Sequence, residues 1–460
     1  MTSGNDKGAP QGEARPSRAA GLQVKQIKAI RGTRDLLPDQ TPLWNRVEAT
    51  ARAVFARYGF GEIRTPVIEA TELFARGVGE ETDIVSKEMF TWEDRARAAS
   101  EKPQSLTLRP ESTAGVVRAY IEHKMGETGA LQKLYYIGPQ FRRERPQRGR
   151  YRQFWQIGAE VIGPPSSGSE SPLRDAEVLE MLASLLDELG VRGWRLELNS
   201  VGNAEDRARY NTALRDALAP VKAKLCPDNQ RRAETNPLRV LDSKDEQDQE
   251  IINGLPKIAD YLGDDSREHF HQVLSALDAC GVPYHVNPRL VRGLDYYTRT
   301  TFEFTVQTGL GTQNALLGGG RYDGLSEMLG GPKAPGIGFA IGEDRLILTL
   351  QAQEDLDSAG TGKTPEPPKL DAYVAPLGVE RNAAALALAR ELRREGLTVE
   401  VGDGTFKLRK SFEIADRVAR AIVLLGEDEI AASEATVKTF ATGEQRRVAR
   451  AELADVLRQR

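Results

Sequence analysis

The stretch from Phe141 to Arg152 reads Phe-Arg-Arg-Glu-Arg-Pro-Gln-Arg-Gly-Arg-Tyr-Arg, and it leads into an alternating segment that ends near Ile162. Successive side chains of a strand point to opposite faces, so this segment separates into an apolar face and a polar face. Chargeable groups seldom gather on one strand face unless they point into a polar pocket or at a ligand. Solvated arginines on an exposed sheet are the simpler alternative, but the arginine-rich stretch favours a phosphate-binding cleft. The apolar face comprises Trp155, Ile157, Ala159 and Val161, and the polar face comprises Arg150, Arg152, Gln156 and Glu160.

The bulk composition is that of an ordinary globular protein. A chain of 460 residues is too long for one core, so we expect two or three domains. The formal net charge of -4 means that a polyanionic partner must be bound by local basic patches. The two cysteines, Cys226 and Cys280, lack CxxC spacing, which argues against a disulfide framework or a thiolate zinc site. Because no apolar run resembles a membrane span or a secretory signal, we expect a cytoplasmic protein that binds no membrane.

The order of patterns predicts an α/β fold with several parts. Residues 1–24 read as a disordered tail, and residues 25–351 as an α+β domain with a mostly antiparallel sheet and flanking helices. A polar, helical texture at about 203–283 indicates an inserted helical subdomain. Residues 352–368, rich in Gly, Pro and charge, predict a linker. Alternating strand and helix patterns in 369–460 predict a small α/β domain.

Two local signals mark the start of the larger domain. Thr41-Pro42 is typical of an N-cap followed by a proline at the first helical position, and Gly59 is a helix stop. The segment 62–69 is strand-like but contains Pro66, which belongs at a sheet edge or between subunits.

Two suggestive motifs favour plain structural interpretations. The run from Gly360 to Thr364 lacks the P-loop glycine at position 357 and any preceding strand, so we interpret it as linker. His269 and His271 are two residues apart in a helical pattern, do not share a helical face, and are therefore expected at the surface.

Three further constellations combine charge with hydroxyl groups or glycine: residues 108–113, 290–299 and 335–346. Taken alone, the carboxylate and hydroxyls of the first are equally consistent with a helix cap. Glycines 318–320 fit neither a dinucleotide fingerprint nor a P-loop, and they predict close approach of the backbone to a ligand or a neighbouring strand.

Together with the arginine-rich stretch, these segments resemble the class II aminoacyl-tRNA synthetases, and among them the histidyl-tRNA synthetases. The similarity runs from about Ile30 to the C-terminus. Two departures, Ser112 for the usual glycine and Asp344 for the usual glutamate, affect fine details of the site. The matching segments are 61–69 as the dimer-forming first motif, 141–160 as the second, 336–346 as the third, and 292–297 and 319–324 as the two histidine-specific peptides.

The resemblance implies that ATP and histidine form histidyl-adenylate, which then reacts with the 3′ end of tRNA. Such chemistry depends mainly on alignment and on neutralising phosphate charge, for which arginine is well suited. Arg142 would hold the α-phosphate and Arg345 the γ-phosphate, while Arg292 would add a second positive charge at the α-phosphate. Glu144 would contact the adenine. Mg²⁺ is expected with the nucleotide, but its protein ligands cannot be assigned from the sequence.

For the amino acid, the resemblance implies separate recognition of an ammonium group and an imidazole. A neutral imidazole has one donor and one acceptor nitrogen, so a carboxylate and a phenol match it. Glu160 and Tyr297 would take these two roles, and Tyr322 would close the pocket. The other expected histidine-binding residues are Glu111, Thr113 and Gln156 at the α-amino group, with Arg292 and Tyr296.

The expected partners are a second copy of the chain and tRNA. Basic residues on or beside one helix of the C-terminal domain are either a solvated face or an anticodon-binding surface, and the resemblance favours the latter. The expected tRNA-binding residues are Arg145, Arg148, Lys407, Arg409 and Lys410, with Arg417 and Arg420 close by.

A non-catalytic relative of these synthetases, the regulatory subunit of ATP phosphoribosyltransferase, is the alternative. That family typically lacks the C-terminal domain and an intact Arg-Gly-Leu-Asp-Tyr-Tyr peptide. This chain has the peptide at 292–297 and a C-terminal domain, which favours the enzyme.

Overall fold

The computed structural model describes residues 26–79, 82, 84–94, 103–243, 245–291, 296–310, 314–361 and 369–458. The chain divides into two compact units, Met1–Thr361 and Gly362–Arg460. The predicted tail, residues 1–24, lies outside the described residues.

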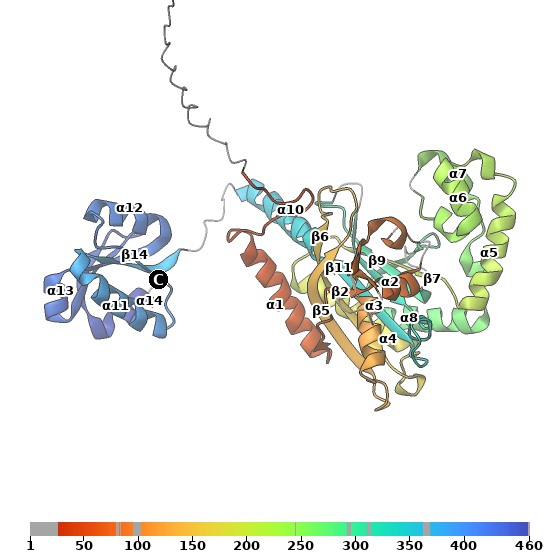
Figure 1. The fold of residues 1–460 in the computed structure, drawn as a ribbon, viewed down its shortest axis with the longest axis horizontal. Helices are drawn as coiled ribbons and strands as arrows, with labels where there is room; N and C mark the ends of the chain where they lie inside the picture. The colour runs from red at the N-terminus through yellow and green to blue at the C-terminus, as the bar shows by residue number, and fades with distance from the viewer. Residues whose placement is uncertain are drawn as a thin grey trace, which may run out of the picture. The chain divides into compact units, whose positions relative to one another are not determined.

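The larger unit is built on an eight-stranded sheet with the order β1-β5-β6-β11-β10-β9-β7-β8 (Figure 1). All neighbouring pairs are antiparallel except β1 with β5 and β7 with β8. The predicted fold class is thereby confirmed for this unit. The strands are β1 Gly61–Glu62, β5 Gln132–Phe141, β6 Gln153–Ile162, β7 Arg195–Ser200, β8 Tyr284–Val286, β9 Thr298–Thr305, β10 Ala315–Arg321 and β11 Gly336–Gly342.

Four long helices share one hydrophobic core with one face of this sheet. In β6, Ile157, Ala159 and Val161 belong to this core and Trp155 packs against it, which confirms the predicted apolar face. Gln156 and Glu160 therefore lie on the opposite face, where α3 (Thr113–Glu122) contributes to a second, smaller cluster. The four helices are α1 Thr41–Arg57, α4 Pro172–Glu188, α8 Asp264–Cys280 and α10 Glu343–Thr361.

The start of α1 and the segment after it differ from the prediction. Gln40, not Thr41, is the N-cap residue, because the preceding turn already places Thr41 in the first helical turn. The segment 62–69 is not one strand, since β1 ends at Glu62 and Pro66 interrupts the chain before β2. Proline has no N–H to donate to a ladder, which explains the break.

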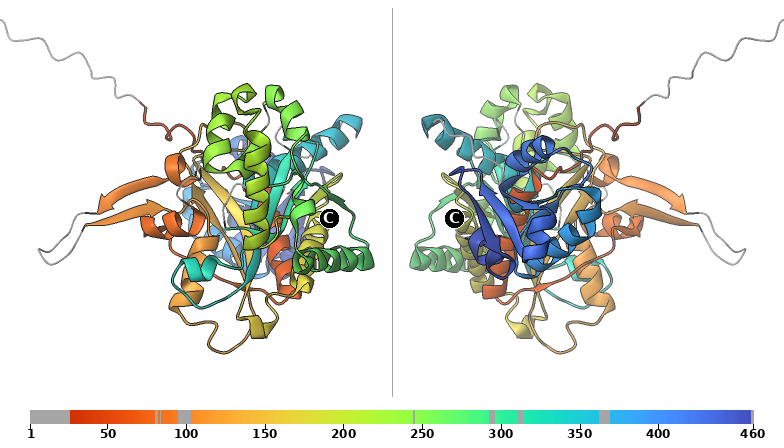
Figure 2. Two further views of the ribbon diagram at one scale, coloured as in Figure 1. Left: turned by 90° about the vertical axis from the view of Figure 1, so that its right-hand side faces the viewer. Right: turned by 90° about the vertical axis from the view of Figure 1, so that its left-hand side faces the viewer.

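A separate three-stranded sheet follows this break. Its order is β2-β4-β3, with β2 at Ile68–Ala70, β3 at Phe90–Asp94 and β4 at Gln104–Leu108. Figure 2 shows β3 and β4, in orange, extending away from the rest of this unit. Ile68 and Trp92 are exposed on this sheet.

The inserted helical subdomain ends earlier than predicted. Its own hydrophobic core, drawn from residues 201–262 together with Val291, includes α5 (Ala204–Leu218) and the short helices that follow (Figure 1). By contrast, α8 packs on α4, and its Val273 and Leu277 belong to the core of the main sheet. The short helices include α6 Pro227–Thr235 and α7 Gln249–Asn253.

His269, on α8, is buried rather than exposed, which corrects the sequence prediction, whereas His271 is at the surface. The imidazole lies 3.6 Å from the carboxylate of Asp175, which itself forms a fully buried ion pair with Arg321. Burial lowers the pKa of His269. The sequence prediction was wrong because most of the residues around His269 in the sequence are polar.

The predicted linker is partly helical. The helix α10 continues to Thr361, because residues 352–359 contain neither glycine nor proline. The side chain of Gln353 also holds the helix, accepting from the backbone N–H of Arg192 at 3.1 Å and donating to its carbonyl at 2.9 Å. The rest of the predicted linker, residues 362–368, lies outside the described residues.

The smaller unit has a five-stranded sheet with the order β13-β12-β14-β15-β16 and its own hydrophobic clusters. The first three strands in this order are parallel with helices between them, as in an α/β domain, and the last two pair antiparallel at one edge. The elements of the smaller unit are β12 Leu370–Pro376, α11 Asn382–Arg394, β13 Val399–Val401, α12 Leu408–Val418, β14 Ala419–Leu425, α13 Glu427–Ala432, β15 Glu434–Thr439, β16 Gln445–Ala449 and α14 Leu453–Arg458.

Among the described residues, none of the helices combines the length and apolar character needed to cross a bilayer.

Glu343, at the start of α10, is a carboxyl group whose charged form is disfavoured by burial. It is fully buried, and neither of its oxygens has a hydrogen-bond partner among the described residues. Burial, reinforced by the charges of Glu48 and Asp344 and opposed by that of Arg52, raises the pKa of Glu343 to about 9. The folded protein therefore keeps a proton on this group at neutral pH.

We expect Glu343→Gln to flatten the dependence of stability on pH. Above about pH 4.5 the unfolded chain releases the proton that the folded protein retains, so this group lowers wild-type stability as pH rises towards 9. The measurement is the Tm of both proteins at pH 6 and pH 9. The wild-type Tm should fall at least about 2 °C further than that of the variant; parallel changes would contradict the buried position of this carboxyl.

Candidate active site

A cavity of about 160 Å³ opens on the polar face of the main sheet. It brings together six of the residues predicted to bind the amino acid, from segments far apart in the sequence. Arg142 also lines it, at the side where a second cavity begins. The six residues are Glu111, Thr113, Gln156, Tyr296, Tyr297 and Tyr322.

Glu111 is both a helix cap and a residue of the cavity, the two roles that the sequence left open for it. Its carboxylate accepts hydrogen bonds from the backbone N–H groups of Thr113 at 2.7 Å and Ala114 at 3.0 Å, so it caps α3. It also lines the cavity. Burial raises the pKa of Glu111, although the backbone N–H groups and Arg142 favour its charged form. A capping carboxylate that faces a cavity is a fixed point of negative charge for an ammonium group.

Glu160 lies beneath the cavity wall in the middle of β6. One carboxylate oxygen accepts from the Thr113 hydroxyl at 2.7 Å, and the other accepts from the Tyr322 hydroxyl at 2.6 Å. Burial raises the pKa of Glu160 to about 8. Glu160 is fully buried and is not among the residues that line the cavity, so Thr113 and Tyr322 connect it to the open space.

The glycine-rich segment around Gly338 makes room for this carboxylate. Gly338 of β11 pairs with Glu160 of β6. A Cβ atom at Gly338 would lie 1.7 Å from a carboxylate oxygen of Glu160, which no side chain permits. Glycine is therefore required here by close approach and not by backbone conformation.

The aromatic side of the cavity contains a residue that the sequence analysis missed. Tyr136 of β5 lines the cavity, and its hydroxyl has no hydrogen-bond partner among the described residues. Burial, with the nearby Glu160 carboxyl, raises the pKa of Tyr136 well above its usual value. Alternation along β5 would have identified it, because Tyr136 pairs with Gly158 and so shares the face of Gln156 and Glu160.

A second cavity, of about 330 Å³, adjoins the first and shares Arg142 and Gln156 with it. It contains the predicted nucleotide-binding residues Glu144 and Arg345, together with Glu303. The sequence analysis did not identify Glu303, which lies on β9 without a distinctive motif.

The arginines of the second cavity are held by backbone oxygens. Arg142 donates from Nε to the carbonyl of Pro110 at 3.0 Å, and its guanidinium lies 5.2 Å from the ring centre of Phe154. Arg345 donates from Nε to the carbonyl of Ala315 at 2.7 Å. Burial and the nearby Arg150 lower the pKa of Arg345. Fixed guanidinium groups around one cavity form a preorganised site for a polyanion.

Asp344, one of the two departures from the family pattern, forms hydrogen bonds with two other segments of the chain. Its carboxylate accepts from Arg34 at 2.7 Å and from the backbone N–H of Trp155 at 3.1 Å. It therefore joins the start of α10 to the N-terminal segment and to β6. Because Asp344 also lines the second cavity, this contact stabilises the wall next to Arg345.

The remaining predicted residues lie elsewhere. Arg292 falls in 292–295, outside the described residues. Arg145 and Arg148 are exposed between β5 and β6. In the smaller unit, three predicted tRNA-binding residues are exposed at the start of α12, whereas Arg420 is in β14 and pairs with Asp371. The three exposed residues are Lys407, Arg409 and Lys410.

One group of possible metal ligands occurs in the part of the chain that the structure describes, in the inserted subdomain: Cys226, Asp245 and Asp248. Asp248 already accepts from the backbone N–H of Cys226 at 2.9 Å and from Asn229, and Asp245 caps a short helix. These contacts explain the group without an ion. None of the three residues lines either cavity.

A mostly antiparallel sheet whose polar face carries a cavity lined by Glu111 and a second cavity lined by anchored arginines, in a chain that also has a separate α/β unit, agrees with a class II aminoacyl-tRNA synthetase. The family pattern described as "Histidyl-tRNA synthetase" matches residues 32–346, and that described as "Anticodon binding domain" matches residues 371–460. The chain belongs to the histidyl-tRNA synthetase family.

Relatives and a solved structure agree with this placement. A protein named histidine–tRNA ligase from Koribacter versatilis (strain Ellin345) is 69% identical over 433 residues, covering 94% of this chain and 96% of the relative. A protein of the same name from Solibacter usitatus (strain Ellin6076) is 53% identical over 93% of this chain and 98% of its own length. The crystal structure of apo S. aureus histidyl-tRNA synthetase matches with a TM-score of 0.75 and 36% identity, covering 94% of this chain and all of that one.

We expect Glu160→Gln to weaken histidine activation selectively. Glutamine keeps the shape but removes the ionised form, so the KM for histidine should rise roughly tenfold at pH 8.5 while the KM for ATP stays unchanged. The pKa of Glu160 is about 8, so ionisation increases as pH rises from 7 to 8.5. The wild-type KM for histidine should fall over that range, and the KM of the variant should not. An effect confined to ATP would place Glu160 at the nucleotide instead.

Proposed function

We infer that this protein activates L-histidine with ATP to form histidyl-adenylate and pyrophosphate, and then transfers the histidyl group to the 3′ end of its tRNA. The observation that carries this inference is that the two cavities share lining residues. The carboxylate-lined cavity suits an amino acid, the arginine-lined cavity suits ATP, and Arg142 belongs to both. Membership of the family supports the same reaction.

In this proposal, the carboxylate of histidine attacks the α-phosphorus of ATP, and pyrophosphate leaves. Arg142, at the junction of the cavities, neutralises the α-phosphate as charge develops there. Arg345 holds the γ-phosphate, and Glu144 contacts the adenine. Arg292 adds a second positive charge at the α-phosphate. Holding both substrates in these positions aligns the attacking oxygen of histidine with the pyrophosphate leaving group.

The amino-acid cavity recognises histidine through its two polar ends. Glu111, Thr113 and Gln156 bind the α-amino group. Tyr297, which lines the cavity, and Glu160, which is connected to it through Thr113 and Tyr322, are assigned to the ring nitrogens, and Tyr322 closes the pocket. Tyr296, which lines the cavity, and Arg292 are proposed to bind histidine as well. Buried polar groups of this kind reject an analogue that lacks the ring nitrogens, because they would be left unpaired.

Mg²⁺ is proposed to accompany the nucleotide. Carboxylate oxygens are suitable ligands for this ion, and Glu303 offers a carboxylate in the wall of the nucleotide cavity. When bound, the ion would neutralise phosphate charge beside the arginines.

The smaller unit is proposed to bind the anticodon end of the tRNA. Lys407, Arg409 and Lys410 are exposed together at the start of α12, and the match to an anticodon-binding family supports this role. Arg145 and Arg148 are proposed to contact the acceptor end, since they lie in the loop that follows β5 near Arg142.

The protein is also proposed to form a homodimer through the segment 61–69 and the sheet beside it. Ile68 and Trp92, which are 49% and 38% exposed, offer apolar surface there for a second copy. We place the enzyme in the cytoplasm, where its tRNA, ATP and histidine are available.

The alternative function is that of a non-catalytic regulatory subunit of ATP phosphoribosyltransferase. The anticodon-binding unit and the names of the relatives at 69% and 53% identity favour the ligase. The two cavities with shared lining residues, and their arginines and carboxylates, favour it as well.

ATP–pyrophosphate exchange with each amino acid in turn tests the proposed activity. Histidine should support exchange at least about 10⁴-fold better than the other amino acids, because the cavity leaves polar groups unpaired with any analogue. A folded protein that binds histidine without exchange would support the regulatory alternative. Preference for another amino acid would overturn the assignment of the pocket.

Removing residues 370–460 should separate activation from tRNA charging. The larger unit has its own core, so histidine-dependent exchange should persist. The kcat/KM for charging tRNA should fall roughly 10²-fold or more, because the second RNA contact is lost. The control is the full-length chain with Lys407, Arg409 and Lys410 changed to alanine. Unchanged charging by the truncated, folded enzyme would exclude an anticodon-binding role.

A further inference from the structure

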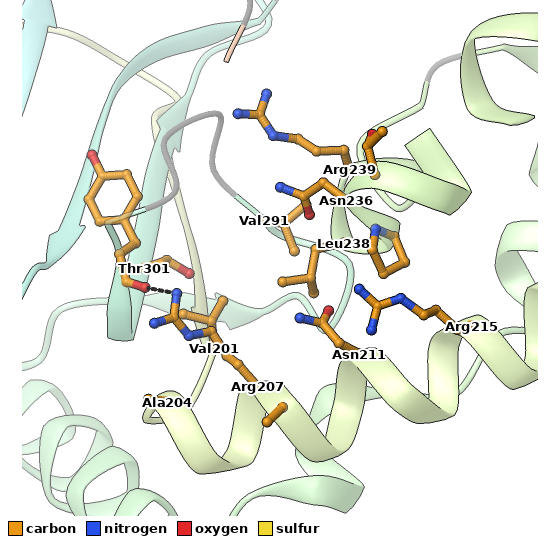
Figure 3. Close-up of a pocket in the computed structure, with 14 residues that line it drawn as sticks. Val201, Ala204, Arg207, Asn211, Arg215, Asn236, Leu238, Arg239, Val291 and Thr301 are labelled. Carbon is orange, nitrogen blue, oxygen red and sulfur yellow. Dashed lines mark hydrogen bonds between the residues drawn. The ribbon is translucent and has the colours of Figure 1, made fainter. Parts of the chain in front are cut away.

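The inserted subdomain contacts the amino-acid pocket through one arginine. Arg207 Nη1, at the end of the first turn of α5, donates to the backbone carbonyl of Tyr297 at 2.8 Å. Figure 3 marks this bond with a dashed line, at the edge of a cavity of about 420 Å³ between the subdomain and the main sheet. Tyr297 lines both this cavity and the amino-acid cavity, so this one residue forms part of the wall of each.

The backbone after Tyr297 departs from a regular strand. The register of β9 against β10 shifts, because Gly320 pairs with Thr301 but the next residue, Arg321, pairs with Thr298. Within this bulge Arg299 has a φ of +48°, a left-handed conformation that non-glycine residues rarely adopt. Ladder contacts alone therefore do not fix the position of Tyr297.

The subdomain supplies the missing restraints at its first residues. Arg299 donates to the carbonyl of Gly202 at 2.8 Å, and Val201 donates to the carbonyl of Arg299 at 2.7 Å. These two backbone bonds tie the bulge to the chain that leads into α5. The bond from Arg207 adds a third contact, directly at the residue whose side chain lines the pocket.

Arg207 is itself held in place by its neighbour, Asp206. The Asp206 carboxylate is 1% exposed and accepts from the backbone N–H groups of Asn203 at 3.1 Å and Gly263 at 2.8 Å. It also accepts from the hydroxyl of Ser266 at 2.5 Å, on α8 of the main core. The first turns of α5 are thus fastened to the main domain, which fixes the origin of the Arg207 side chain.

The ring of Tyr297 has little freedom to compensate for a displaced main chain. Gly320 of β10 lies against it, since a Cβ atom there would approach the ring to 2.7 Å. On the other side, the centre of the Tyr296 ring is 4.8 Å away. A shift of the carbonyl would therefore move the phenol within the amino-acid cavity.

We propose that Arg207 is a positioning residue for amino-acid recognition: by holding the main chain of Tyr297, it lets the inserted subdomain set the affinity of the pocket for histidine. This inference rests on the proposed role of Tyr297 in histidine binding. The subdomain acts without touching the amino acid, through the contact between Arg207 and the Tyr297 carbonyl.

The test is ATP–pyrophosphate exchange by the full-length chain with Arg207→Ala, Arg207→Lys and Arg215→Ala. Arg215 lines the same cavity two turns further along α5, so its removal matches the loss of charge. Arg207→Ala should raise the KM for histidine about tenfold, as loss of a charged hydrogen bond does. The KM for ATP and the Tm should match those of Arg215→Ala. Arg207→Lys, which can still donate, should recover most of the affinity.

Several results would overturn the proposal. One is that Arg207→Ala raises the KM for histidine and the KM for ATP equally. Another is that Arg207→Ala and Arg215→Ala have the same KM for histidine. A defect shared by both alanine variants and seen only in tRNA charging would instead assign the arginines to RNA phosphates, since exchange requires no RNA. Glu160→Gln, measured in parallel, tests the pocket itself. If it raises the KM for histidine and Arg207→Ala does not, the positioning role alone fails.

Discussion

A carboxyl group buried inside a sheet is the constraint around which the larger unit is arranged. Glu160 occupies the middle of β6, where water cannot reach it, so hydroxyl donors must come from other elements. Thr113 brings the start of α3 over the sheet, and Tyr322 brings the end of β10. Gly338 removes the side chain that would occupy the same space. A single buried group thereby fixes how three separate segments converge.

The chemistry is arranged outward from this point. Beside Glu160, hydroxyls and the Glu111 carboxylate line a small cavity, and Arg142 lines both this cavity and the larger one. The guanidinium groups of Arg142 and Arg345 are anchored by backbone carbonyls, so little reorganisation is needed when phosphate charge arrives. The positions of charge are therefore set by the fold before the substrates bind.

Most of the site could be predicted because its residues occur in short, ordered motifs and because β6 alternates strictly. Tyr136 was missed because its strand carries no motif, although the same alternation points to it. The limits of the inserted subdomain, the burial of His269 and the extent of α10 were predicted wrongly for a different reason. The first two depend on which distant core an amphipathic helix joins, and a polar local sequence does not reveal that choice. The extent of α10 depends on the contact of Gln353 with the distant Arg192.

The two ends of the inserted subdomain meet at one side chain. Asp206 receives hydrogen bonds from Asn203, where the chain leaves the main sheet, and from Gly263, where it returns to α8. An insertion whose ends are adjacent can change in length or content without altering the strand before it or the helix after it. The subdomain is therefore a place where this fold can accept added or removed residues, because both of its ends remain held by Asp206.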